Sequence, residues 1–132
     1  MISNQILQST IEGIKNISRV ELCVTDIEGK VLVTTFPEVE ISQNDIVTFA
    51  QSQADSQTMK NYQFFKVYDE HQLEYILIAN GGSEDVYMVG KIAAFQIQNL
   101  LVAYKERFDK DNFIKNLLLD NLLLVDIYNR AK

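Results

Sequence analysis

The chain has 132 residues, and 47% of them are hydrophobic. This length suits a single domain, and the apolar content is enough for a real core, which excludes a disordered chain. Twelve basic and eighteen acidic residues give a formal net charge of −6. Because binding to a phosphate backbone requires clustered Lys and Arg, the composition argues against direct nucleic-acid binding by this domain.

The cysteine content and the N-terminus bear on the compartment. Cys23 is the only cysteine, so the chain has no intramolecular disulfide and no cysteine-based zinc cluster. Residues 1–5 lack a basic segment followed by an apolar run, which a signal peptide would have. We also expect no apolar stretch to approach the roughly 20 residues of a bilayer crossing. The sequence therefore predicts a cytoplasmic protein without a membrane-spanning segment.

The chain begins with a predicted helix and a β-hairpin. Apolar residues recur at steps of three and four between Ile2 and Ile17, which is typical of an amphipathic helix. Two β-branched segments, 20–25 and 30–36, flank a turn that contains Gly29. These segments predict an antiparallel pair of strands.

A second helix, a loop and a second hairpin follow. Ser42 is in the position of an N-cap, and the apolar side of the short helix after it includes Phe49. Residues 51–61 are polar and are predicted to form a loop. The second hairpin is predicted from the apolar segments 62–68 and 73–80, which are separated by a polar turn.

The last third of the chain predicts a long helix and a helical tail. Ser83 is a predicted N-cap, and an apolar stripe continues from Val86 to Phe108 for about six turns. The polar residues 109–111 interrupt this pattern, and a last apolar segment covers 113–128. We therefore expect a long helix followed by a helical tail.

This order of elements predicts an α+β domain with one antiparallel sheet of four to five strands, flanked by helices. The strands at 20–25 and 73–80 are expected in the centre. Both sides of the strands carry apolar groups, so both faces of the sheet should be covered. The terminal helices would cover one face and the short helix around Phe49 the other. Because that second cover is thin, we expect a ligand cavity beneath it.

The terminal helices carry more apolar surface than one sheet face can bury. The runs at 100–102 and 117–125 supply most of this surplus. Apolar patches beyond a few hundred Å² usually mark an interface, and a homodimer through the terminal helices is the simplest solution. For the last segment, packing against the remainder of a longer chain is an equally good explanation.

Five residues are candidate ligand-binding residues. If the second hairpin closes symmetrically over residues 69–72, Lys66 lies opposite Tyr75 and Phe64 lies opposite Leu77. A cation and a phenol on one aromatic face would orient a small acid. The alternative is that the Lys66 stem lies on the sheet with its amine in solvent. The candidate set is Cys23, Phe49, Phe64, Lys66 and Tyr75.

The sequence does not favour catalysis or metal binding. His71 is the only histidine and lies in a predicted turn, where exposure to solvent is expected. Cys23 has no base nearby in the sequence and is explained as a small buried hydrophobe that also lines the cavity. The acidic pairs at 26–28 and 69–70 lie in turns, and the segment 81–83 lacks the Lys of a nucleotide loop. We expect no enzyme, no metal and no cofactor.

Several stretches resemble a known family. They are VTDIEGKV at 24–31, ADSQ at 54–57, YQFFKV at 62–67, GKIAAFQIQNL at 90–100 and DNFIKNLLLDNL at 111–122. Together they resemble the N-terminal sensor domain of carbohydrate-diacid-regulator (CdaR)-type transcription regulators of Gram-positive bacteria. The resemblance spans nearly the whole chain.

The resemblance implies a PAS-like sensor domain at 1–108 and a connecting helical segment at 109–132, which leads to domains outside this sequence. Any DNA contact would belong to a C-terminal helix-turn-helix among those domains. The chain has no Arg-rich stretch between Phe36 and Tyr62 to hold the two carboxylates of a sugar diacid. The function expected is small-molecule sensing, of an organic acid, and homodimerisation in a cytosolic transcription regulator. A ligand-free homodimerisation module is the alternative, and a small enzyme is the least favoured.

Overall fold

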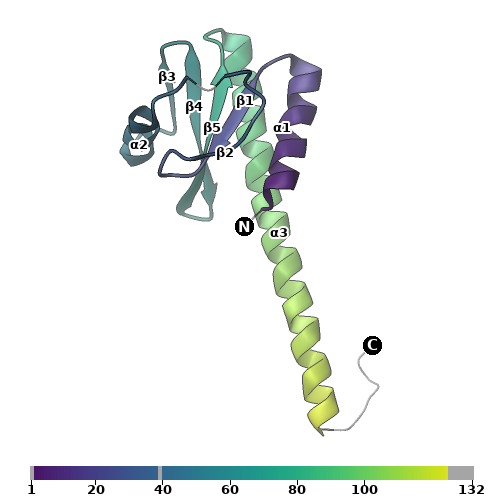
Figure 1. The fold of residues 1–132 in the computed structure, drawn as a ribbon. Helices are drawn as coiled ribbons and strands as arrows, with labels where there is room; N and C mark the ends of the chain where they lie inside the picture. The colour runs from purple at the N-terminus through teal and green to yellow at the C-terminus, as the bar shows by residue number, and fades with distance from the viewer. Residues whose placement is uncertain (1, 39, 125–132) are drawn as a thin grey trace.

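The computed structural model describes the backbone of residues 2–38 and 40–124, and the surroundings of side chains as far as residue 104. In chain order, the elements are α1 (Asn4–Ser18), β1 (Leu22–Thr25), β2 (Val31–Thr34), α2 (Gln43–Gln51), β3 (Ser56–Met59), β4 (Tyr62–Asp69), β5 (Gln72–Asn80) and α3 (Glu84–Leu124). The five strands form one antiparallel sheet in the order β2-β1-β5-β4-β3 (Figure 1). This confirms the predicted α+β class, and β1 and β5 are neighbours in the sheet interior, as expected.

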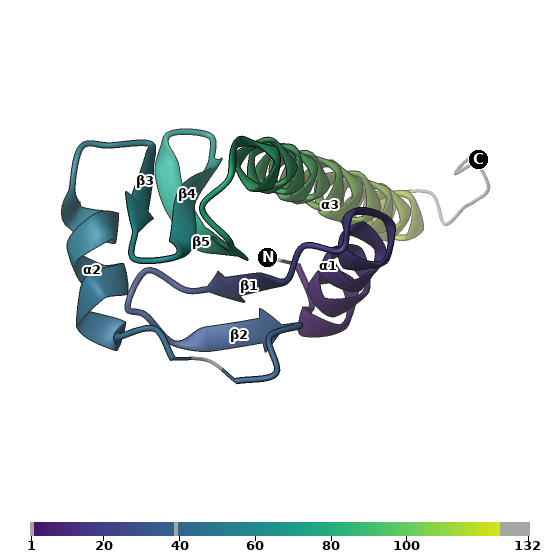
Figure 2. The ribbon, with the colours of Figure 1, turned by 90° about the horizontal axis from the view of Figure 1, so that it is seen from above.

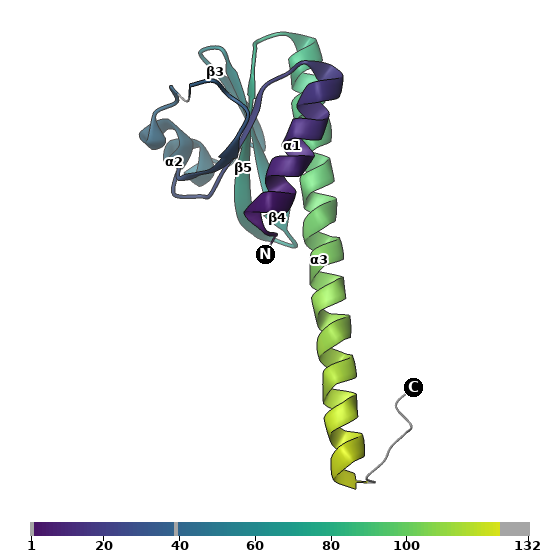
Figure 3. The same ribbon diagram turned by 45° about the vertical axis from the view of Figure 1, so that its right-hand side comes forward.

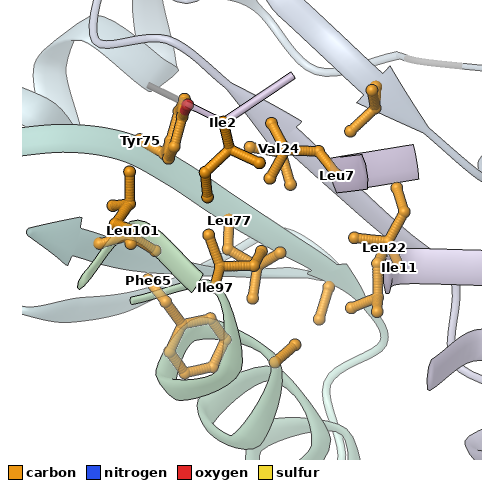
Figure 4. Packing of buried hydrophobic residues seen from close by; sticks show 14 of the residues in the cluster. Ile2, Leu7, Ile11, Leu22, Val24, Phe65, Tyr75, Leu77, Ile97 and Leu101 are labelled. Atoms are coloured by element: carbon orange, nitrogen blue, oxygen red, sulfur yellow. The ribbon is translucent and has the colours of Figure 1, made fainter. Parts of the chain in front are cut away.

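Helices cover both faces of the sheet. Helices α1 and α3 lie side by side on one face, and α2 lies on the other (Figure 2). Helix α1 begins after Ser3, whose hydroxyl accepts a hydrogen bond from the Ile6 N–H at 3.3 Å. It ends at Arg19, which adopts a left-handed backbone with φ of 65°. Its buried residues Leu7 and Ile11 face the sheet, as the helical spacing predicts (Figure 4).

The polar segment between α2 and β4 contains an edge strand. The prediction of a loop at 51–61 is therefore wrong in part, because residues Ser56–Met59 form β3 and pair with β4. The two central residues of β3, Gln57 and Thr58, are exposed. A short edge strand without buried side chains has no apolar alternation, which is the signal that identifies strands in a sequence.

Helix α3 is one continuous helix of 41 residues. The polar residues at 109–111 interrupt the apolar pattern without ending the helix, because helix formation depends on backbone hydrogen bonds that they do not disturb. The predicted division between residues 108 and 109 falls inside this helix, which extends well past the sheet (Figure 3). The apolar run at 117–125 lies outside the residues whose side-chain surroundings are described.

Within the described residues, one helical segment is apolar and long enough to cross a membrane by length and composition alone. It is Glu84–Tyr104, the part of α3 beside the sheet. The expectation that no stretch reaches this length is wrong by this measure. The reason is that α3 is apolar on two sides: Ala93, Ile97 and Leu101 are buried in the core, and other apolar residues face outward.

Helix α3 approaches the sheet most closely at Gly90. A Cβ atom on Gly90 would lie 2.3 Å from Cε1 of Phe65, which is much shorter than van der Waals contact. The Phe65 ring of β4 packs against α3 at this point (Figure 4). Glycine is therefore required here by the space between helix and sheet rather than by its backbone conformation.

Gly90→Ala should destabilise the domain by about 1–3 kcal/mol, because the added methyl group must displace the Phe65 ring. Gly13→Ala in α1 is the matched control, since nothing lies within 4 Å of a Cβ atom at that position. The control should stabilise the domain by up to about 1 kcal/mol, the usual gain from Ala in a helix. Urea unfolding of both variants measures the two effects. Equal stabilisation by both would contradict the close approach.

Candidate functional site

The space beneath α2, where the sequence predicts a cavity, is filled by side chains. Phe49 of α2 and Phe64 of β4 are 0% and 1% exposed, and their rings meet edge to face with centroids 5.6 Å apart. The buried cluster on this face consists of Cys23, Phe36, Ile46, Phe49, Phe64, Ile76 and Ile78. The hollow that borders Phe64 has a volume of about 10 Å³, which is room for about one water molecule. A metabolite does not fit between Phe49 and Phe64, so these residues are core residues.

Lys66 is engaged by α2. Its Nζ donates a hydrogen bond to the carbonyl oxygen of Ser52, the residue that ends α2, and lies 5.3 Å from the centroid of the Phe49 ring. A cation is favourable at a helix C-terminus, where carbonyl oxygens carry partial negative charge. Lys66 therefore anchors the end of α2. This role differs from both predicted ones, a ligand contact and an amine in solvent.

Tyr75 lies on the opposite face of the sheet from Phe64 and Lys66. The hairpin does close over residues 69–72, but the register shifts between Val67 and Tyr68, where β5 contains one extra residue. Lys66 consequently pairs with Ile76 in place of Tyr75. A shift of one residue moves a strand's side chains to the other face, and this is why the predicted pairing is wrong.

Tyr75 is 3% exposed, in the core beneath α1 and α3. Burial raises the pKa of its hydroxyl, and a hydrogen bond from the Ile2 backbone opposes that rise. Cys23 is also buried, on the α2 face, and burial raises the pKa of its thiol to about 11. Both side chains are therefore held in core positions, away from any open site.

An open groove lies on the face of the sheet that carries α3. It is formed between α3, the edge strand β3 and the neighbouring strand β4, and its volume is about 280 Å³. The lining residues are Asp55, Ser56, Phe65, Lys66, Tyr68, Tyr87, Lys91, Ala94, Phe95 and Gln98. Of the five predicted site residues, Lys66 alone borders this groove.

Tyr87 and Lys91 provide hydrogen-bond donors along the α3 side of the groove. Lys91 Nζ lies 3.5 Å from the Tyr87 hydroxyl and 5.6 Å from the centroid of its ring. A hydrogen bond with Ser56 and the adjacent Lys91 ammonium lower the pKa of Tyr87. The Tyr87 ring packs against Phe65, with centroids 5.5 Å apart. The groove thus combines an aromatic surface with two polar groups that favour an anion.

A carboxylate lies among the groove residues on the strand side. The Tyr68 hydroxyl donates to Asp55 Oδ1 at 3.4 Å. Burial raises the pKa of Tyr68, and the negative charge of Asp55 raises it further. The groove therefore offers a hydrogen-bond acceptor and a negative charge in addition to the donors on α3. Among the residues that the structure describes, no group of three His, Cys, Asp or Glu side chains could hold a metal ion.

The sequence pattern reveals only the α3 side of the groove. Ser56 belongs to an edge strand that the sequence pattern does not reveal, so its position beside α3 could not be inferred. Tyr87 and Lys91, four residues apart on a predicted helix, do form a visible pair, since residues at this spacing are neighbours. This pair was the one signal for the site in the sequence.

Comparisons with known proteins concern the fold. No protein-family model matches the sequence, and no curated protein matches it. The structure is similar to that of Myxococcus xanthus MglB, with a TM-score of 0.54 and 8% sequence identity, over 78% of this chain and 94% of that chain. At this identity the likeness shows a shared α+β fold and carries no conclusion about activity. The resemblance to CdaR-type regulators stays a hypothesis that rests on the sequence stretches.

Lys66→Met should weaken the attachment of the end of α2. The methionine keeps the apolar stem and removes the ammonium, which leaves the Ser52 carbonyl without this donor, at a cost of about 1–3 kcal/mol. Lys30→Met is the matched control, because Lys30 is exposed, and it should change stability by less than about 0.5 kcal/mol. Urea unfolding and hydrogen exchange in α2 measure the difference. Equal stability of the two variants would argue against the anchor.

The native Cys23 thiol should not react with Ellman's reagent at pH 8. Its raised pKa keeps it protonated, and its burial excludes the reagent. Adding guanidinium chloride should release the full thiol signal. A Ser9→Cys variant in a Cys23→Ala background is the positive control, because residue 9 is exposed on α1. Rapid reaction of native Cys23 would mean that the α2 face opens.

Proposed function

We propose that this chain is a ligand-sensing regulatory domain whose site is the groove between α3 and the β3–β4 edge. The observation that carries the proposal is an open groove of about 280 Å³ with an aromatic surface, an ammonium group and a phenol. Its volume lies just below the range of roughly 300–1,000 Å³ for small-molecule sites, so the ligand would be a small metabolite.

The groove chemistry favours a small organic acid. A carboxylate would accept hydrogen bonds from Lys91 Nζ and the Tyr87 hydroxyl, which are charge-assisted and strong. The rings of Phe65 and Phe95 would contact an apolar part of the ligand. Asp55 would accept from a hydroxyl or amino group on the same molecule. Hydroxy acids and amino acids with apolar side chains are thus the ligand class that we propose.

Because α3 forms one side of the groove, ligand binding would act on the position of this helix. A ligand that contacts both the sheet edge and α3 would stabilise one position of the helix over others. Helix α3 continues well past the sheet, as far as Leu124. The resemblance to CdaR-type regulators supports a cytoplasmic transcription regulator as the whole protein. In that case a helix-turn-helix outside this sequence would contact DNA.

A ligand-free dimerisation module is the second candidate function. Two observations favour it: the space beneath α2 is filled, and the polar groups of the groove already pair with one another. The Tyr87 hydroxyl meets Lys91, and the Tyr68 hydroxyl meets Asp55. A ligand would have to exchange these hydrogen bonds for its own. Catalysis is the least supported role, since no His or Cys borders the groove.

Binding can be tested by isothermal titration calorimetry and by NMR with hydroxy acids, amino acids and plain carboxylic acids of similar size. We expect a hydroxy or amino acid to bind best, and Lys91→Met to weaken it by about tenfold or more, because the charge-assisted hydrogen bond is lost. Lys30→Met should leave the affinity unchanged. If no acid perturbs the groove resonances at millimolar concentration, the ligand-free module is the better description.

A further inference from the structure

Helix α3 carries a second apolar side that faces away from the domain. Met88, Ile92, Phe95 and Val102 are 54%, 59%, 62% and 47% exposed. They follow one another at steps of four, three and seven residues. Asn99 lies four residues after Phe95 and three before Val102, so with Asn99 included the steps alternate between four and three. We call these five residues the outer stripe. Their spacing is that of the a and d positions of a coiled-coil heptad, with Asn99 at an a position.

The outer stripe is not needed for the domain's own core. The side of α3 that packs on the sheet is a different set of residues, in which Ala93, Ile97 and Leu101 are at most 2% exposed. Figures 2 and 3 show α1 and the sheet beside the first half of α3. Large apolar side chains in regular spacing on a free helix face mark an interface.

We propose that the outer stripe is the seam of a parallel, two-stranded coiled coil with a second copy of this chain, in which Asn99 of one copy meets Asn99 of the other. A heptad seam is complementary to itself about a two-fold axis that runs along the helices. The residues that flank the seam at the e and g positions are Val89, Lys91, Gln96, Gln98 and Ala103, and they carry one charge in total. Two copies can therefore meet without like-charge repulsion across these positions.

Asn99 favours a parallel pair of α3 helices over an antiparallel pair and over a lipid surface. In a parallel pair, the two Asn99 amides lie in the same layer and can hydrogen bond to each other, which satisfies them within an apolar seam. An antiparallel pair would place each amide against an apolar d residue, and a lipid surface would leave it without a partner. A parallel pair also directs the two long extensions of α3 the same way, side by side.

This inference depends on α3 alone and stands whether or not the groove binds a ligand. The two are adjacent, however, because Phe95 belongs to the outer stripe and also lines the groove. A ligand in the groove would contact a residue of the seam. Ligand binding in the groove would therefore change the packing of the seam. The change would be measured as a change in dimer affinity.

The first test is the oligomeric state of the full chain, by sedimentation equilibrium. We expect a dimer, and Phe95→Glu should raise its dissociation constant by about thirtyfold or more, because it places a charge in the centre of the seam. Gln96→Glu, with the same added charge one residue away, is the control and should remain dimeric. Ile92→Lys repeats the test if Phe95→Glu fails to fold. A monomeric wild type, or a dimer that tolerates both seam variants, would overturn the proposal.

The second test is the direction and register of the pair. In a Cys23→Ala background, Asn99→Cys should form an interchain disulfide on mild oxidation, since parallel in-register helices bring the two introduced thiols together. Ser9→Cys on α1 should not cross-link. Asn99→Leu should give a more stable but less uniform assembly, with larger oligomers. A dimer whose Asn99→Cys variant does not cross-link would overturn the parallel register.

Discussion

The close packing of α3 on the sheet is the constraint on which the other features depend. Helix and sheet can approach this closely because Gly90 leaves room for the Phe65 ring. With α3 held there, Ala93 and Ile97 are buried, and the helix directs Tyr87 and Lys91 toward the β3–β4 edge. The rest of its circumference is left for the outer stripe. The close approach at Gly90 is therefore compatible with all three features: the core, the groove and the exposed outer stripe.

The two faces of the sheet differ: the α2 side is a closed core, and the α3 side has an open groove. On the α2 side, Phe49 and Phe64 fill the space, and Lys66 holds the end of the helix. This side is a closed core, in keeping with a small domain that needs most of its apolar side chains for stability. On the α3 side the helix leaves the edge of the sheet uncovered, so polar and aromatic groups remain open to solvent. We therefore look for binding beside α3.

Except for β3, the element order could be predicted from the sequence, as could the antiparallel sheet and its two unequal covers, because they follow from apolar periodicity and turn residues. The site could not, because it depends on details that leave no periodic signal. One extra residue in β5 moves Tyr75 to the opposite face from Lys66. The edge strand β3 buries too little to show alternation, so Ser56 was not placed beside Tyr87. The Lys66 amine was predicted at a ligand or in solvent, yet it is taken by the Ser52 carbonyl, a contact set by tertiary packing.

The unbroken backbone of α3 makes it a lever arm. Its first half is clamped to the sheet, and residues 105–124 continue the same axis for about 30 Å at 1.5 Å per residue. A tilt of about 10° at the clamp would swing the far tip by about 5 Å, roughly the pitch of one helical turn. A movement too small to disturb the sheet would thus become a displacement of several ångströms at the distal end of the helix.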